Sequence, residues 1–370
     1  MKASIWTAAA MLGIALSAIV AVTPRFEAMH QVEAIRKGPG VTAVKSLSDY
    51  AAGLKGGAGD TEIYVLDSGR PGGTAVILGG THPNEPSGHL TAVMIIENGV
   101  PTRGRLIVIP RANASGFTHT DYSEGSPQRF QLSTAAGERW FRFGSRATNP
   151  VHQWPDPDIY VHPSGQRLSG SETRNLNRAY PGRADGTLTE QVAFAIVELI
   201  RAEKADVAID LHEASPEYPV INAMVAHERA MDMAAAAVVG LQMDGVDIGL
   251  EPSPKTLHGL SHREWGDATE TLAVLMESAN PSQGRLRGAT SAELIVNGKD
   301  SMYARAARLG RLFVPFDEKG IHLNVRVARH LTAVDTLLRT FSEMTPDRPI
   351  ELSRLPTYED MVTKGIGSYL

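Results

Sequence analysis

Short apolar runs in this chain alternate with longer segments in which apolar residues recur every three or four positions. The short runs predict buried strands, and they cover residues 62–66, 74–78, 105–109, 206–211 and 271–276. The periodic segments predict amphipathic helices, which cover residues 88–98, the stretch from Thr187 through Ile200, and Val327 through Phe341. This alternation predicts an α/β domain whose mixed, mainly parallel central sheet is flanked by helices on both faces.

A nearly continuous apolar run at the N-terminus stands apart from these elements. It extends from Ile5 to Val22, and its length lies between that of a signal-peptide core and that of a spanning helix. Small residues before Thr23 permit cleavage, but no clean Ala-x-Ala motif is present. We therefore predict that residues 1–25 are a signal peptide or a membrane anchor. The protein is then exported, and is either periplasmic or anchored to the inner membrane facing outward; a buried, alanine-rich core helix is the alternative.

The rest of the chain divides by composition. Residues 26–60 are expected to be a connector with one helix, followed by a compact domain over residues 61–345 and a C-terminal tail over 346–370. Between residues 111 and 174 the periodicity disappears and aromatic residues are frequent. A long irregular segment inside a compact domain is typical of an active-site wall or lid. A surface insertion packed by its own aromatic side chains is the alternative.

Composition narrows the possible functions. The 370 residues are 42% hydrophobic and 21% charged, as in globular proteins. The net charge of −5 comes without a basic stripe, so nucleic acid is not an expected partner. The absence of cysteine excludes disulfides, thiolate metal sites and cysteine nucleophiles, so a metal site must use nitrogen and oxygen donors. Nothing in the sequence specifies an oligomeric state.

His82, Glu85 and His212 are candidate ligands of one metal ion. His82 and Glu85 follow the predicted strand that ends at Leu78, and His212 directly follows another predicted strand. Ligands in open α/β sheets bind outside the carboxyl ends of the strands, so these three residues are expected to meet at one edge. A catalytic zinc ion takes three protein ligands and keeps one position open. The sequence therefore predicts one Zn²⁺ per chain, held by two histidines and one glutamate.

Further polar residues are expected at the same edge. Glu277 ends an apolar predicted strand, where burial of a carboxylate is costly unless the group is paired or bound. Asn177 and Arg178 precede the helix that Thr187 caps, and a guanidinium beside an amide can bind a carboxylate; a pair that only holds its own loop is the alternative. Asp210 lies two residues before the second histidine and thus on the same strand face, where it can orient that ligand.

Taken in order, the motifs His-x-x-Glu, Asn-Arg-x-Tyr-Pro-Gly, Asp-Leu-His and a late strand-terminal Glu make this chain resemble the zinc carboxypeptidase superfamily. It is most similar to the branch of succinylglutamate desuccinylase and aspartoacylase, over roughly residues 74–281. The resemblance implies that His82, Glu85 and His212 are the zinc ligands. It also implies that Asn177 and Arg178 form a clamp for the substrate carboxylate, and that Glu277 is the catalytic glutamate. It also implies that Arg167 polarises the scissile carbonyl, with Arg174 as the competing candidate.

The chain departs from the superfamily pattern in one segment. Carboxypeptidases carry a tyrosine shortly before the catalytic glutamate, whereas no tyrosine occurs here between Tyr218 and Tyr303. His258, His262 and Arg263 lie in this segment instead, either as substrate contacts or as ordinary loop residues. The difference weakens the interpretation of the protein as an exopeptidase.

These features together predict a zinc-dependent hydrolase that cleaves an amide bond of a small, carboxylate-bearing substrate, in the manner of an N-acyl amino acid deacylase. Zinc and Glu277 would activate the attacking water, and Glu277 would return the proton to the leaving amine. One alternative is a metallocarboxypeptidase that acts on peptides, including those of the cell envelope. Another is a non-catalytic envelope binding protein that kept the pocket, although a pure binding protein has no need of a general base.

Overall fold

The computed structural model describes residues 4–121 and 125–370, and its centre is an eight-stranded sheet. In spatial order the strands are β1 (Val41–Ser46), β2 (Glu62–Asp67), β5 (Arg105–Ile109), β3 (Thr74–Leu78), β10 (Val207–Ala214), β13 (Leu272–Ala279), β11 (Ala223–Ala226) and β12 (Gly249–Pro252). The four strands β5, β3, β10 and β13 are parallel. Antiparallel pairs join β1 to β2, β2 to β5, and β13 to β11. The predicted mixed, mainly parallel sheet is confirmed.

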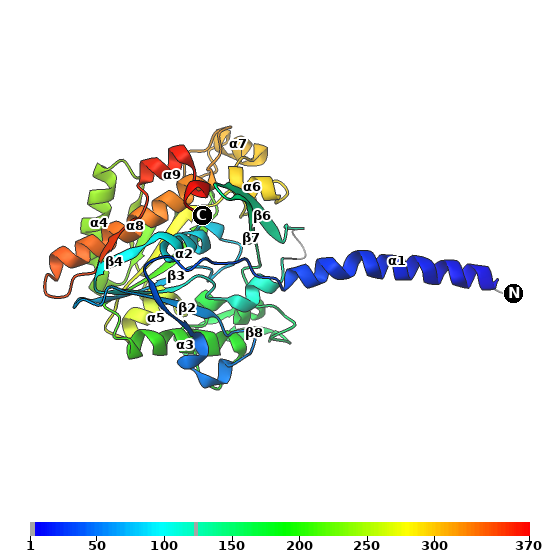
Figure 1. Cartoon of the computed structure of the whole chain (residues 1–370), viewed down its shortest axis with the longest axis horizontal. Coiled ribbons are helices and arrows are strands. Elements are labelled where there is room, and N and C mark those ends of the chain that lie inside the picture. Colours follow the sequence, from blue (N-terminus) through cyan, green and yellow to red (C-terminus); the bar gives the residue numbers. More distant parts are fainter. Residues whose placement is uncertain (1–3, 122–124) are drawn as a thin grey trace.

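Helices cover both faces of this sheet, also as predicted (Figure 1). One core contains side chains of α2 (Pro86–Asn98), α4 (Met231–Met243) and α8 (Leu323–Met344). The core on the opposite face contains side chains of α3 (Leu188–Ala202) and α5 (Ser261–Ala268). The shorter helices α6 (Ala292–Asn297), α7 (Ser301–Arg308) and α9 (Tyr358–Lys364) lie on the α8 side of the molecule (Figure 1). Side chains of the central strands alternate between the two cores, because successive residues of a strand point to opposite faces.

The start of α3 shows how local sequence sets these elements. The Thr187 hydroxyl accepts a hydrogen bond from the Glu190 N–H, and the Glu190 carboxylate accepts one from the Thr187 N–H. This is the capping box that the sequence predicts, and it satisfies two backbone donors at the helix start. Val192 and Ile196, one helical turn apart, are buried against the sheet.

The described residues of the segment over 111–174 form two hairpins, short 3₁₀ helices and connecting loops. The hairpins are β6–β7 (Arg129–Thr134 and Gly137–Arg142) and β8–β9 (Ile159–Val161 and Arg167–Ser169). Phe130 and Phe141 stack with ring centroids 5.9 Å apart and join the α2 side of the core. The β6–β7 hairpin is therefore packed by its own aromatic side chains, whereas Trp154 in a later loop is 72% exposed. One loop of this segment also reaches the candidate site.

Two expected domain boundaries do not coincide with boundaries in the structure. The supposed connector over residues 26–60 supplies the edge strand β1 and the buried Leu47 and Leu54. Glu33, also in this segment, is 2% exposed, and its carboxylate lies 2.8 Å from both Arg111 and His89. This segment is thus part of the domain, held by a buried charge cluster that hydrophobic periodicity does not reveal.

The supposed C-terminal tail over residues 346–370 is also packed. Its strand β14 (Glu351–Ser353) pairs with β4 (Val100–Arg103), and α9 packs on α8. Met361 and Ile366 are buried in the core on the α2 side. These elements are too short for a periodic pattern to appear in the sequence, which explains why the segment was expected to be a tail.

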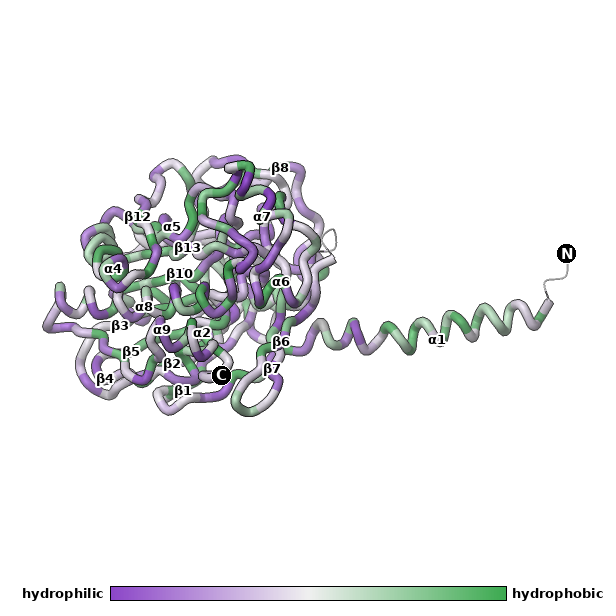
Figure 2. The backbone as a smooth tube through the Cα atoms, turned by 90° about the horizontal axis from the view of Figure 1, so that it is seen from above, coloured by the Kyte–Doolittle hydropathy of each residue, from purple (hydrophilic) through white to green (hydrophobic). Residues whose placement is uncertain are grey.

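The N-terminal apolar run forms α1 (Ile5–Met29), which projects away from the rest of the molecule (Figure 1). Its apolar residues continue along the exposed helix (Figure 2). Within the described residues it is the one helix long and apolar enough to cross a membrane, and none of that stretch is buried. The alternative of a buried core helix is therefore wrong.

Candidate metal-binding and catalytic site

The three candidate ligands meet at the carboxyl end of the central strands. The chain leaves β3 through Gly79 and Gly80, and Gly80 has a φ of +70° and packs against Phe117. A tight turn follows, in which the Glu85 N–H donates to the His82 carbonyl at 2.9 Å. Glu85 is the N-cap of α2. His212 lies within β10, two strands along the sheet from β5 and next to β3.

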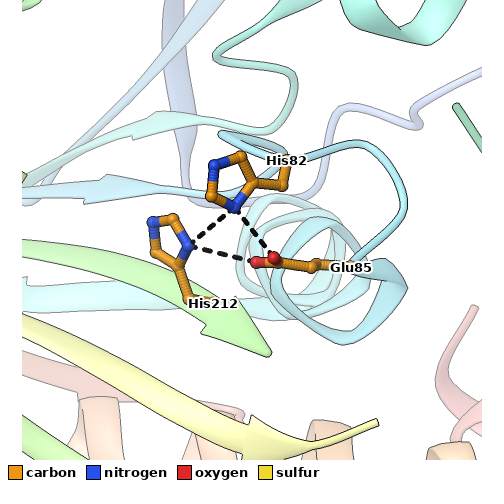
Figure 3. Close-up of side chains that lie close together, drawn as sticks. All are labelled: His82, Glu85 and His212. Carbon is orange, nitrogen blue, oxygen red and sulfur yellow. Dashed lines mark hydrogen bonds and ion pairs between the residues drawn. The ribbon is translucent and has the colours of Figure 1, made fainter. Parts of the chain in front are cut away.

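The donor atoms of these residues converge on one point (Figure 3). His82 Nδ1 lies 2.8 Å from Glu85 Oε1, and His212 Nδ1 lies 3.1 Å from Glu85 Oε2. The two Nδ1 atoms are 3.1 Å apart. In a tetrahedral zinc site the ligand atoms are separated by about 3.3 Å, as metal distances of about 2 Å require. The donor set and its spacing fit one zinc ion.

The outer nitrogen of each histidine is held by an acceptor. His82 Nε2 lies 2.8 Å from Asn175 Oδ1, an oxygen that also accepts the Asn177 N–H. His212 Nε2 lies 2.8 Å from Asp210 Oδ2, as expected from the sequence. Each Nε2 therefore carries a proton, and each Nδ1 lone pair is available to the metal. Such partners fix the tautomer and the ring orientation of metal-binding histidines.

The charges around His212 favour a cation at this point. Burial by itself lowers the pKa of His212, but the adjacent carboxylates of Asp210 and Glu85 more than offset it and raise the pKa to about 10. Burial lowers the pKa of His82 to about 4, since Arg146 adds to the effect and Glu85 only partly opposes it. The pair thus carries one positive charge when no metal is bound, and a divalent cation can replace that proton.

Glu213 and Arg326 support the metal ligands from the α8 side. The Glu213 N–H donates to Glu85 Oε2 at 3.0 Å, and the Glu213 carboxylate accepts the Ser87 N–H in the first turn of α2, also at 3.0 Å. The fully buried Arg326 of α8 donates to Glu213 Oε1 at 2.8 Å. This pair ties α2, whose N-cap is the candidate ligand Glu85, to β10, which carries the candidate ligand His212. No motif or periodicity in the sequence marks this pair; the one local signal is the acidic residue directly after His212.

Glu277 lies beside the ligands on the neighbouring strand. It is opposite His212 in the parallel pairing of β10 and β13, so both side chains leave the same face of the sheet. Its Oε2 is buried and has no hydrogen-bond partner among the described residues. Burial raises the pKa of Glu277 to about 8, with a further increase from Glu85 and an opposing effect of His212. An unpartnered carboxyl group of raised pKa beside a metal site is suited to proton transfer.

Asn177 and Arg178 line the same cavity as the ligands and Glu277. Asn177 Oδ1 accepts the Ser261 N–H at 2.8 Å, which fixes the amide at the start of α5. Arg178 Nη1 donates to the Asn177 carbonyl at 2.6 Å, and its Nε lies 3.9 Å from Glu172. Burial lowers the pKa of Arg178, so a nearby anion would be favourable. The structure places this pair in the cavity, beside the candidate ligands and Glu277.

The arginine expected to polarise the carbonyl is not in this cavity. Arg167 is exposed on β9, where it pairs with Val161, and it is absent from the residues that line the cavity. The competing Arg174 forms a two-point ion pair with Asp156. Arg146 lines the cavity instead, with Nη1 3.2 Å from Glu85 Oε1. It comes from a loop of the irregular segment, and no sequence motif marked it.

The cavity itself has a volume of about 290 Å³. Of the three residues proposed to replace the missing tyrosine, only His262 lines it. His258 is instead hydrogen bonded to Glu264, and Arg263 forms ion pairs with Asp267 and Glu228. The cavity thus brings together the candidate ligands, Glu277, Asn177, Arg178 and His262, and adds Arg146, whereas Arg167 lies outside it.

Comparison with known proteins finds similarity in structure alone. No protein-family model and no curated protein matches the sequence. A succinylglutamate desuccinylase from a Silicibacter species matches with a TM-score of 0.37 and 20% identity over 59% of this chain and 53% of its own. A metallo-carboxypeptidase from Burkholderia cenocepacia matches with a TM-score of 0.47 and 12% identity over 86% of this chain and 68% of its own.

The cell shape determinant protein Csd4 of Helicobacter pylori, with product bound, matches with a TM-score of 0.47 and 11% identity over 82% of this chain and 59% of its own. The aligned part spans about half the length of the desuccinylase. A succinylglutamate desuccinylase and a metallo-carboxypeptidase are thus both among the solved structures that this chain resembles.

Proposed function

We propose that this protein is a zinc-dependent amidohydrolase that removes the acyl group from an N-acyl amino acid. The observation that carries the proposal is one cavity that contains the converging donors of His82, Glu85 and His212 together with the unpartnered carboxyl group of Glu277. A purely structural metal site has four protein ligands, whereas the described residues supply three here. Asn177 and Arg178 add the means to bind an anionic substrate.

Each group of residues has a separate role in the proposed reaction. A zinc ion held by the three ligands would polarise the amide carbonyl and lower the pKa of its bound water towards 7. Arg178 and Asn177 bind the substrate carboxylate and place the amide beside Glu277. Glu277 takes a proton as the water oxygen bonds to the carbonyl carbon, and gives it to the amide nitrogen as the C–N bond breaks. One amide and one water thus become a carboxylic acid and an amine.

Arg146 is the residue we assign to the developing negative charge on the carbonyl oxygen. Its guanidinium lies 3.2 Å from Glu85, while Arg167 lies at the surface. A donor directed at a developing oxyanion commonly contributes about 3 kcal/mol to catalysis. The loop that carries Arg146 belongs to the irregular segment over residues 111–174, which in this proposal forms part of the active-site wall.

The test is metal analysis of the purified protein followed by hydrolysis assays on N-acyl amino acids and on short peptides. We expect one zinc per chain, and release of free amino acid from the acylated compounds. Glu277→Gln should retain zinc and lose at least about 100-fold in rate, while Glu251→Gln, an exposed glutamate on β12, should behave as wild type. Release of C-terminal residues from peptides without deacylation would instead support a metallocarboxypeptidase. Zinc binding with no hydrolysis of either class would support a non-catalytic binding protein.

We also propose that the protein is exported and that α1 is its signal peptide or membrane anchor. The exposure of this apolar helix supports the proposal, because no contact within the described part of the chain covers its apolar surface. Expression of the full chain in a Gram-negative host, with fractionation and mass analysis of the product, separates the two forms. A shortened soluble periplasmic protein indicates a signal peptide, an intact membrane-bound protein indicates an anchor, and an intact cytoplasmic protein contradicts export.

A further inference from the structure

The candidate active-site cavity has a second, apolar end. Its polar end contains the metal ligands, Glu277 and the carboxylate clamp. The apolar end is built by side chains from two strands, from the segment that leads into α5 and from the first turn of α5, namely Val225, Leu275, Leu257, Leu260 and His262. The two ends therefore differ in the part of a substrate that they can bind.

The strand geometry places the apolar end directly below Glu277. Leu275 and Glu277 are two residues apart on β13, so both point to the same face, about 7 Å apart along the strand. Val225 on β11 is the pairing partner of Leu275, so the two side chains lie next to each other on this face. Both are almost completely buried apart from their contact with the cavity.

The apolar wall and the carboxylate clamp are in direct contact. The Ser261 N–H donates to Asn177 Oδ1 at 2.8 Å, and the Tyr180 N–H donates to the Gly259 carbonyl at 3.3 Å. Gly259 has a φ of +86° and lies so close to the Arg178 carbonyl that a β-carbon would collide with it. An α-amino acid carries its carboxylate and side chain on the same carbon. Adjacent binding sites for the two groups fit such a molecule.

The apolar end contains no full charge. Among the described residues that line the cavity from β11, β13 and residues 254–262, only His262 and Glu277 are ionisable. His262 Nδ1 is hydrogen bonded to Ser253 Oγ at 2.8 Å. Burial lowers the pKa of His262 to about 3, so its ring is neutral. A charged substrate side chain placed here would lose its hydration without gaining a partner.

We propose that this apolar end binds the side chain of the amino acid that is released, so that the substrates are N-acylated α-amino acids with uncharged, apolar side chains. This inference rests on the proposed function. Leucine, methionine and phenylalanine derivatives are therefore expected to be substrates, whereas derivatives of aspartate, glutamate and the diamino acids are expected to be poor ones. Leu275 and Val225 form the floor of the pocket and limit the size of the side chain.

The test is a comparison of kcat/KM for N-acetyl-L-leucine, N-acetyl-L-methionine and N-acetyl-L-phenylalanine with N-acetyl-L-aspartate, N-acetyl-L-glutamate and Nα-acetyl-L-lysine, using the full-length, zinc-loaded protein. We expect a ratio of at least about 100 in favour of the apolar group, because a charged side chain would be buried without a partner. Equal or faster hydrolysis of the acidic or basic compounds overturns the inference while the proposed function stands.

Two variants localise the effect. Leu275→Ala should raise the preference for phenylalanine over leucine derivatives about tenfold, because it enlarges the floor of the pocket. Val225→Ala, a smaller change on the adjacent strand, should move the preference in the same direction. Leu272→Ala is the matched control, since Leu272 is on the same strand but outside the cavity. Unchanged selectivity in both cavity variants would show that another part of the protein selects the side chain.

A failure of the proposed function can be separated from a failure of this inference. If the zinc-loaded protein hydrolyses none of the compounds, the proposed function fails, and calorimetric titration with the free amino acids tests the pocket by itself. Tighter binding of L-leucine than of L-aspartate by at least tenfold then supports the inference. Equal or tighter binding of L-aspartate overturns it.

Discussion

Removal of Arg326 is the most informative perturbation of the support beneath the metal ligands. Its side chain is fully buried, and it donates to the equally buried Glu213 at 2.8 Å and to the Ile295 carbonyl. Arg326→Met keeps much of the volume and removes the charge. Burial already raises the pKa of Glu213 and Arg326 opposes that rise, so in the variant this carboxyl group is expected to take up a proton or remain an unpaired buried charge.

The expected loss of stability follows from this burial. Removal of one partner of a buried ion pair commonly costs about 3–5 kcal/mol. With an unfolding entropy of about 2.1 cal/mol/K for each of the 370 residues, this loss of stability lowers the Tm by about 4–6 °C. Zinc affinity should also fall, by about tenfold, because Glu213 holds both the Glu85 carboxylate and the first turn of α2.

Thermal unfolding followed by circular dichroism and a zinc competition titration measure these effects. Arg339→Met is the matched control, because Arg339 is on the same helix and its side chain is 58% exposed. A surface pair of this kind contributes less than about 1 kcal/mol. The double variant with Glu213→Gln should lose less than the sum of the two single losses, since the two groups interact. If Arg326→Met is as stable as Arg339→Met, or binds zinc as tightly as wild type, the support role is refuted.

Three further predictions concern other charged groups. Asp210→Asn should weaken zinc binding about 10–100-fold, because it removes the carboxylate that orients His212; unchanged affinity in the competition titration would exclude this role. Arg146→Ala should lower kcat about 100-fold with zinc content unchanged, whereas Arg167→Ala should leave kcat within about twofold of wild type. The reverse result would restore the role that the sequence resemblance implies for Arg167. Burial would raise the pKa of Glu33, but His89 and Arg111 together lower it to about 2. The contribution of Glu33 to the free energy of unfolding is therefore full above pH 4.5 and is lost as the pH falls towards 2. This loss is about 3 kcal/mol. The free energies of unfolding of Glu33→Gln and wild type, measured in urea, should therefore differ most near pH 6 and converge near pH 2. A difference that is constant with pH would contradict this assignment.

Local sequence patterns were sufficient for the elements that carry the site. The apolar runs at residues 74–78 and 271–276 form β3 and β13, and the capping box at Thr187 starts α3. Each of these patterns depends on neighbours within one strand or one helical turn. The expectation that strand ends gather polar residues held for His82, His212 and Glu277, because parallel strands end at the same edge of the sheet.

Patterns failed where the stabilising contacts join distant residues. Residues 26–60 lack periodicity and so were expected to be a connector, yet Glu33 is buried against charges more than fifty positions away. Buried ion pairs leave no period in the sequence. The short terminal strand β14 and helix α9 were missed for the related reason that they gain their stability from β4 and α8, not from a pattern of their own.

The sequence by itself thus determined the α/β sheet, the apolar N-terminal helix and the set of His82, Glu85 and His212 with the nearby Glu277, Asn177 and Arg178. Only the tertiary structure decided which arginine reaches the ligands, which pair supports them from α8, and that one end of the cavity is apolar. The physical reason is the range of the interactions. Strand and helix patterns are set by residues a few positions apart, whereas the placement of Arg146, Arg326 and Leu275 around one cavity depends on the path of the whole chain.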